Sequence, residues 1–121
     1  MSEIGFGLVL DAADPEALAP FWAAALRYTV VGGVGAYVLL VPEGRSGPKL
    51  LLQKVPEGKS GKNRMHLDIE VLDIQAEADR LEALGARRLR PGAVGEHGHR
   101  WILMVDPEGN EFCVCDAGTA Q

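Results

Sequence analysis

Two halves of the chain repeat one another. The segment Gly7–Leu26 matches His66–Gly85 at a constant shift of 59 residues, and LLVPEG (Leu39–Gly44) matches MVDPEG (Met104–Gly109) at a shift of 65. Self-similarity at a fixed period indicates repeated structural units, and each half is too short to bury a good core alone. The sequence therefore predicts two copies of one small unit, with a functional site shared between them.

Composition narrows the class of partner. The chain has 121 residues, 47% of them hydrophobic, and a formal net charge of −5. This charge disfavours nucleic acid and anionic membranes as partners, because both require basic patches. No apolar run approaches the ~20 residues that span a bilayer, and the start MSEIGFG lacks the basic region of a signal peptide. Two cysteines, Cys113 and Cys115, are too few and too close for a disulfide framework. We therefore expect a cytoplasmic protein.

Each half reads as a strand, a helix and three further strands. In the first half, residues 1–58, the expected strands are Ile4–Asp11, Tyr28–Val31, Gly35–Val41 and Lys49–Val55, and the helix is Asp14–Leu26. In the second half, residues 59–121, the expected strands are Met65–Val71, Arg87–Leu89, Arg100–Val105 and Glu111–Cys115, and the helix is Asp73–Leu84. An aspartate caps each helix, and turns rich in glycine and proline separate the strands. The sequence predicts an α+β fold of tandem βαβββ units with a mixed, largely antiparallel sheet of about eight strands.

This organisation resembles the vicinal oxygen chelate superfamily. The segments KNRMHLDIEV and GHRWILMVDPEGNEFCVC are most similar to its small glyoxalase-like and bleomycin-resistance-like proteins, and the resemblance covers roughly Ile4–Asp116. It implies a cup-shaped sheet with the helices on its convex face and a small-molecule ligand held between the halves. It also implies a homodimer, because related folds pair their units across a dimer and so cover their edge strands. Whether the cup forms within one chain or across such a dimer is left open.

The resemblance also bears on metal binding. Metal-using members take one ligand from the first strand and one from the last strand of each half. The corresponding positions here are Gly7, Gln53, His66 and Cys113. Gly7 has no side chain, and Cys113 stands where a glutamate is usual. Glyoxalase-type chemistry needs a divalent ion and a carboxylate that can act as a base. We therefore expect no complete metal site and assign no cofactor. A divalent metal stays an alternative, with zinc at His66 and Cys113 as the main exception.

Strand alternation indicates which side chains would line the cup. His66 shares a face with Asp68 and Glu70, and Cys113 shares a face with Glu111. Each assignment leaves the more apolar residues to pack beneath the helices. The acids either form a solvated rim or include one carboxylate that pairs with His66 and fixes its tautomer.

A second group of candidates surrounds these strands. Trp101 either packs against other side chains or provides an aromatic surface for a ligand. Arg100 or Arg64 would contact an anionic group of the ligand near the mouth of the cup. His66 is the candidate catalytic residue, although a hydrogen-bonded wall residue is the plainer interpretation. The expected ligand contacts are Gln53, His66, Asp68, Arg100, Trp101, Glu111 and Cys113.

Two classes of function fit this pattern. The first is a small-molecule binding protein without a complete metal site. The alternative is a lyase, isomerase or dioxygenase-type enzyme that uses His66 with a carboxylate or an atypical divalent metal site. A protein-interaction module is less favoured, because a curled cup is costly to maintain without a ligand. The residues do not identify the ligand.

Overall fold

The computed structural model describes residues 7–44, 46–61, 63, 66–96 and 99–116. These residues form nine strands and two helices, and the chain divides into two compact units, Met1–Lys59 and Ser60–Gln121. The predicted α+β class is confirmed. Expected strand residues 4–6 and Met65, together with the linker residue Arg64, lie outside the described residues. No helix in the described part of the chain has the length and apolar character needed to cross a membrane.

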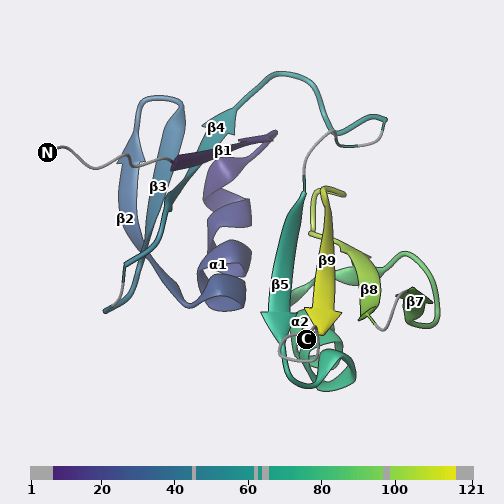
Figure 1. Ribbon diagram of the computed structural model, residues 1–121. Coiled ribbons are helices and arrows are strands. Elements are labelled where there is room, and N and C mark those ends of the chain that lie inside the picture. The colour runs from purple at the N-terminus through teal and green to yellow at the C-terminus, as the bar shows by residue number, and fades with distance from the viewer. Residues whose placement is uncertain (1–6, 45, 62, 64–65, 97–98, 117–121) are drawn as a thin grey trace, which may run out of the picture. The chain divides into compact units, whose positions relative to one another are not determined.

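The first unit is a four-stranded mixed sheet with one helix (Figure 1). The strands lie in the order β1-β4-β3-β2, with β1 parallel to β4 and the other neighbours antiparallel. This is the expected βαβββ order. Its elements are β1 (Gly7–Ala12), α1 (Pro15–Leu26), β2 (Tyr28–Val34), β3 (Tyr37–Pro42) and β4 (Lys49–Lys54).

The second unit has the same arrangement with one strand more. Its order is β5-β9-β8-β6, with β5 parallel to β9, and β7 also pairs with β8. The expectation of about eight strands in one sheet is corrected to nine described strands in two sheets. The additional strand β7 escaped detection because it is short and lies in a run rich in glycine and proline. The elements are β5 (Leu67–Val71), α2 (Ile74–Leu84), β6 (Arg87–Arg88), β7 (Val94–Glu96), β8 (His99–Val105) and β9 (Glu111–Asp116).

Local signals fix both helices where they were expected. The Asp14 and Asp73 carboxylates each accept a hydrogen bond from the backbone N–H three residues on, at 3.3 and 3.0 Å respectively. Pro15 follows the first cap at a position where its missing N–H costs nothing. Helix α2 ends at Gly85, whose φ of 120° favours glycine. Helix α1 ends at Arg27, a left-handed residue with φ of 58° that the sequence did not indicate.

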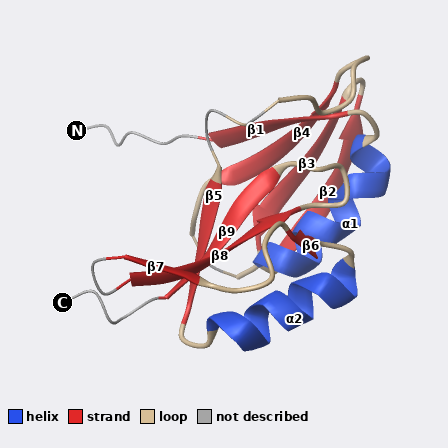
Figure 2. Cartoon of the chain, turned by 90° about the vertical axis from the view of Figure 1, so that its right-hand side faces the viewer, coloured by secondary structure: helices blue, strands red, loops and turns tan. Residues whose placement is uncertain are grey.

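Each helix covers one face of its own sheet and buries the core there. Helix α1 contacts β2, β3 and β4, whereas α2 contacts β6, β8 and β9 (Figure 2). The opposite face of each sheet carries no helix of its own unit and is called here its helix-free face. The cup that the resemblance implies would need both units and stays a prediction. The main buried side chains are Leu18, Phe21, Trp22, Leu40, Leu50 and Leu52 in the first unit, and Ala78, Leu81, Ile102, Met104, Phe112 and Val114 in the second.

The motif DPEGN forms a tight turn between β8 and β9 whose first and last residues are buried. Asp106 is only 1% exposed. Its carboxylate accepts hydrogen bonds from the backbone N–H groups of Glu108 and Asn110, both at 2.9 Å. It also accepts from the Asn110 side-chain amide at 2.9 Å. Gly109 takes a positive φ of 90° and donates its N–H to the Asp106 carbonyl. The motif therefore sets the hairpin that places β9 in the sheet.

Replacing this buried carboxylate should destabilise the fold strongly. Asp106→Ala leaves three donors without their acceptor, and each unsatisfied buried group costs about 1–3 kcal/mol, so we expect a loss of roughly 3 kcal/mol or more. Asp73→Ala removes only an exposed helix cap and should cost about 1 kcal/mol. Urea unfolding of both variants measures the two losses. An Asp106→Ala loss no larger than the Asp73→Ala loss would contradict this role.

Candidate functional site

The parallel pairing of β5 with β9 brings several polar side chains together on one face of the second sheet. The register sets Asp68 opposite Cys113 and Glu70 opposite Cys115, and β5 and β9 run side by side in the same direction (Figure 1). Because side chains alternate along a strand, these residues share the helix-free face. Pairing of β8 with β9 adds Trp101 opposite Cys115. The helix-free face of the second sheet comprises Asp68, Glu70, Trp101, Leu103, Glu111, Cys113 and Cys115.

His66 lies just before β5 and pairs with a carboxylate of this face. Its Nδ1 is 3.2 Å from Oδ1 of Asp68, and the two side chains are 37% and 53% exposed. A carboxylate beside Nδ1 favours the tautomer protonated there and leaves Nε2 of the neutral ring able to accept a proton. Since both side chains are partly exposed, their contact contributes little to stability and stays accessible to a ligand.

Cys113 completes a compact group of three chemically different side chains. One imidazole nitrogen of His66, one carboxylate oxygen of Asp68 and the Cys113 sulfur all lie within 4.8 Å of one another. Cys113 is 7% exposed, whereas His66 and Asp68 reach solvent. Imidazole, carboxylate and thiol are all metal-binding groups, so the donor set fits a divalent ion. The sequence predicted Asp68 as a ligand contact on this face and as a partner for His66, but not as a metal donor.

The second cysteine has a different character. Burial, together with the nearby Asp68, Cys113 and Glu70, raises the pKa of the Cys115 thiol to about 12. The Cys115 thiol is therefore neutral at physiological pH and not an activated nucleophile. The two cysteines do not form a disulfide.

Not all of the remaining expected ligand contacts lie on the helix-free face of the second sheet. Trp101 is partly buried on the helix-free face, and the backbone carbonyl of Glu111 accepts a 3.5 Å hydrogen bond from the side chain of Asn63. Arg100 is exposed and pairs with Gly95, and alternation puts it on the opposite side of β8 from Trp101. The structure therefore does not bring Arg100 to the His66 group. The alternative cation Arg64 lies outside the described residues, so a cation near the mouth of the cup stays a prediction.

The register of the strand pairs also changes which residues of the two halves correspond to one another. The capping residues of the two helices are 59 residues apart, and the same shift matches Val9 with Asp68. Val9 pairs with Leu51 and Asp68 pairs with Cys113, so Cys113 corresponds to Leu51 and not to Gln53. Sequence comparison of the halves could not predict this register, because the loops before their last strands differ in length.

The first unit presents a less polar surface. Val9 and Tyr37 on its helix-free face are 59% and 40% exposed. Gln53 lies in this face, paired with Asp11 on one side and Tyr37 on the other, and its expected role as a ligand contact stays a prediction. The helix-free face of the first sheet comprises Val9, Asp11, Tyr37, Leu39, Leu51 and Gln53.

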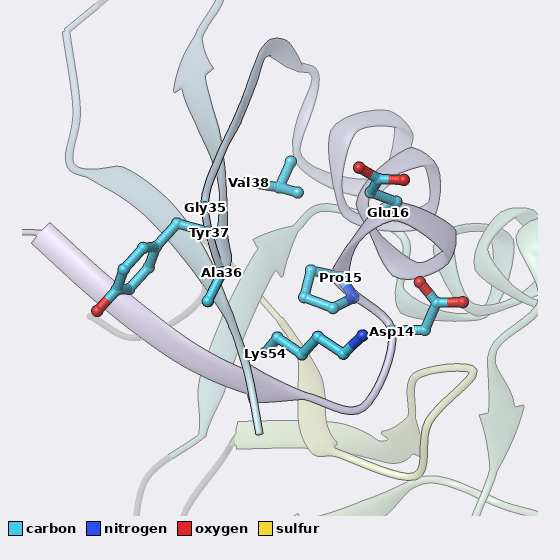
Figure 3. A pocket seen from close by; sticks show the side chains of 8 residues that line it. All are labelled: Asp14, Pro15, Glu16, Gly35, Ala36, Tyr37, Val38 and Lys54. Atoms are coloured by element: carbon cyan, nitrogen blue, oxygen red, sulfur yellow. The ribbon is translucent and has the colours of Figure 1, made fainter. Parts of the chain in front are cut away.

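A small pocket of the first unit was not expected from the sequence. It has a volume of about 200 Å³ and lies where the start of α1 meets the β2–β3 turn (Figure 3). The Lys54 side chain extends toward Asp14, and the Tyr37 ring points away from it. Ligand pockets usually measure roughly 300–1,000 Å³, and this pocket contains none of the expected site residues. It is lined by Asp14, Pro15, Glu16, Gly35, Ala36, Tyr37, Val38 and Lys54.

Comparison with known proteins identifies the family. The profile described as the glyoxalase-like domain matches residues 7–115. Together with the two mixed sheets, each covered by one helix, this match shows that the chain belongs to the glyoxalase-like domain family. The predicted membership of the vicinal oxygen chelate superfamily is thereby confirmed. Among curated proteins, none shows significant sequence similarity to the chain.

Solved structures agree on the fold. A glyoxalase/bleomycin resistance protein/dioxygenase from Nocardioides has a TM-score of 0.72 at 20% identity, covering 100% of this chain and 89% of its own. A family enzyme from Burkholderia phytofirmans has a TM-score of 0.75 at 12% identity, covering 92% and 96%. The fosfomycin resistance protein FosX from Mesorhizobium loti has a TM-score of 0.72 at 15% identity, covering 98% and 95%. At these identities the likeness establishes the fold alone.

Proposed function

We propose that the chain is a small-molecule binding protein whose ligand contacts the helix-free face of the second sheet. The observation that carries this proposal is the solvent-exposed His66–Asp68 pair beside the partly buried Trp101 face. A sheet face with no helix of its own unit and several convergent polar groups is where this fold can hold a ligand. The family fold supports the proposal, because its structural relatives include a resistance protein for the small molecule fosfomycin.

The charge of this face indicates the chemistry of the ligand. Asp68, Glu70 and Glu111 supply carboxylates, and Arg100 lies on the other side of β8. Carboxylates accept hydrogen bonds and repel anions, so the face suits a ligand with hydroxyl or amine donors. Trp101 would stack against a planar part of the same molecule. We therefore propose a planar organic ligand bearing donor groups as the occupant.

A second candidate function rests on the His66–Asp68 distance of 3.2 Å. A carboxylate that orients an imidazole is a common arrangement for general acid–base catalysis. On this view Nε2 of His66 would remove or deliver a proton on the bound molecule, as in a lyase or isomerase. A dioxygenase-type reaction would require a metal ion in addition.

Binding should depend on His66 and Trp101 but not on Arg100. Loss of a hydrogen bond to a charged group costs about 1.5–3 kcal/mol, so His66→Ala should weaken binding about tenfold or more. Trp101→Ala should weaken binding as well, because it removes the stacked ring and the apolar area that the ring buries. Arg100→Ala is the matched control, because Arg100 neighbours Trp101 in sequence on the other face. A ligand-observed NMR screen of aromatic amines and phenols, followed by calorimetry, measures these changes.

The screen also has an optical readout. Trp22 is 2% exposed in the first unit's core, so a ligand-dependent change in tryptophan fluorescence reports on Trp101. Binding that survives His66→Ala, or that Arg100→Ala weakens equally, would contradict the proposed face. Turnover of the bound molecule that stops in Asp68→Asn would favour the enzymatic alternative.

We also propose that the chain forms a homodimer. Strand β2 is an edge of the first sheet, and its Val31 and Val34 are 60% and 78% exposed. Apolar edge strands are usually covered by a partner. Light scattering should therefore give twice the 12.9 kDa chain mass, and Val34→Lys should lower it. Leu72→Lys, at an 86% exposed site in the second unit, is the control. A single-chain mass at micromolar concentration would contradict the dimer.

A further inference from the structure

Three donors converge on the helix-free face of the second sheet, and all come from one unit. His66 and Asp68 lie at the start of β5, and Cys113 lies opposite Asp68 on β9. The four positions that the superfamily resemblance implies are divided between both halves and do not include Asp68. The carboxylate that is missing at the last strand of this unit is therefore supplied by its first strand.

The spacing of these donors suits a tetrahedral ion. Donors bound to one zinc ion at about 2.0–2.3 Å lie roughly 3.3–3.8 Å from one another. The observed 3.2 Å between Nδ1 of His66 and Oδ1 of Asp68 is close to this separation, so both atoms can bind one ion once Nδ1 has lost its proton. The group as a whole spans 4.8 Å, so binding requires a closure of about 1 Å. His66 and Asp68 are exposed and can rotate toward Cys113, which is held by burial.

We propose that His66, Asp68 and Cys113 bind one zinc-type divalent ion. A thiolate donor selects zinc, cobalt or cadmium over magnesium and manganese, which prefer oxygen ligands. Three protein donors leave one tetrahedral position open for water or a ligand oxygen. When bound, such an ion would polarise that oxygen. The inference deepens the proposed function and rests on it in placing the ion where the organic ligand binds.

The test uses the metal alone on the full chain. Protein stripped with chelator and kept reduced is titrated with cadmium and cobalt, and the thiolate-to-metal charge-transfer band is followed. We expect a band that saturates at one ion per chain and is displaced by zinc but not by magnesium. Cys113→Ser should abolish the band. His66→Ala and Asp68→Asn should weaken affinity at least tenfold while the band persists at saturation.

Cys115→Ser is the matched control. Cys115 lies two residues along the same strand, near Asp68 but outside the three-donor group, so Cys115→Ser should keep the band and its saturation at one ion per chain. His66 and Asp68 are exposed, so their variants test the site independently of any effect of Cys113→Ser on folding. Absence of a saturable band in the unaltered chain, or a band lost in Cys115→Ser but kept in Cys113→Ser, would overturn the proposal. Either result would leave His66-dependent binding of an organic ligand untouched.

Discussion

The parallel pairing of β5 with β9 is the interaction on which the candidate site depends. It joins the first and last strands of the second unit, which are far apart in sequence. The register is held from the helix side, where Leu67 pairs with Phe112 and Ile69 with Val114. Phe112 and Val114 are fully buried. A slip of one residue would expose these apolar side chains to solvent, so burial on one face fixes which polar groups meet on the other.

The two units show how one scaffold supports two chemically different surfaces. Val9 faces Leu51 in the first unit at the positions where Asp68 faces Cys113 in the second. The exchange leaves the helix-covered cores unaffected, because it concerns only the helix-free faces. The function of this chain therefore has to be argued from its own side chains, and the shared fold gives only the positions.

Much of the fold could be predicted because its signals are local. Asp14 and Asp73 mark the helix starts by capping, and alternation correctly grouped Asp68 with Glu70 on one face. The superfamily followed from the repeat and from the DPEGN turn around Asp106. Division of the strands into two sheets and the short strand β7 carry no comparable local signal.

The site was harder to predict because it depends on cross-strand register. Sequence comparison of the halves matched Cys113 with Gln53, whereas the ladders match it with Leu51. Only the register places the Asp68 carboxylate next to Cys113 and so adds a third donor to the expected imidazole and thiol. Arg100 is a different case, because alternation from Trp101 was sufficient to place it on the other face.

The most direct measurement of this register and its chemical consequence is X-ray absorption at the zinc edge of the zinc-loaded chain. We expect one sulfur at about 2.3 Å and nitrogen or oxygen donors at about 2.0–2.2 Å. That shell corresponds to Cys113 with His66, Asp68 and one further light atom. A shell with no sulfur would place the ion away from β9, and a shell with two sulfurs would show that Cys115 replaces a predicted donor. Either result would contradict the central claim.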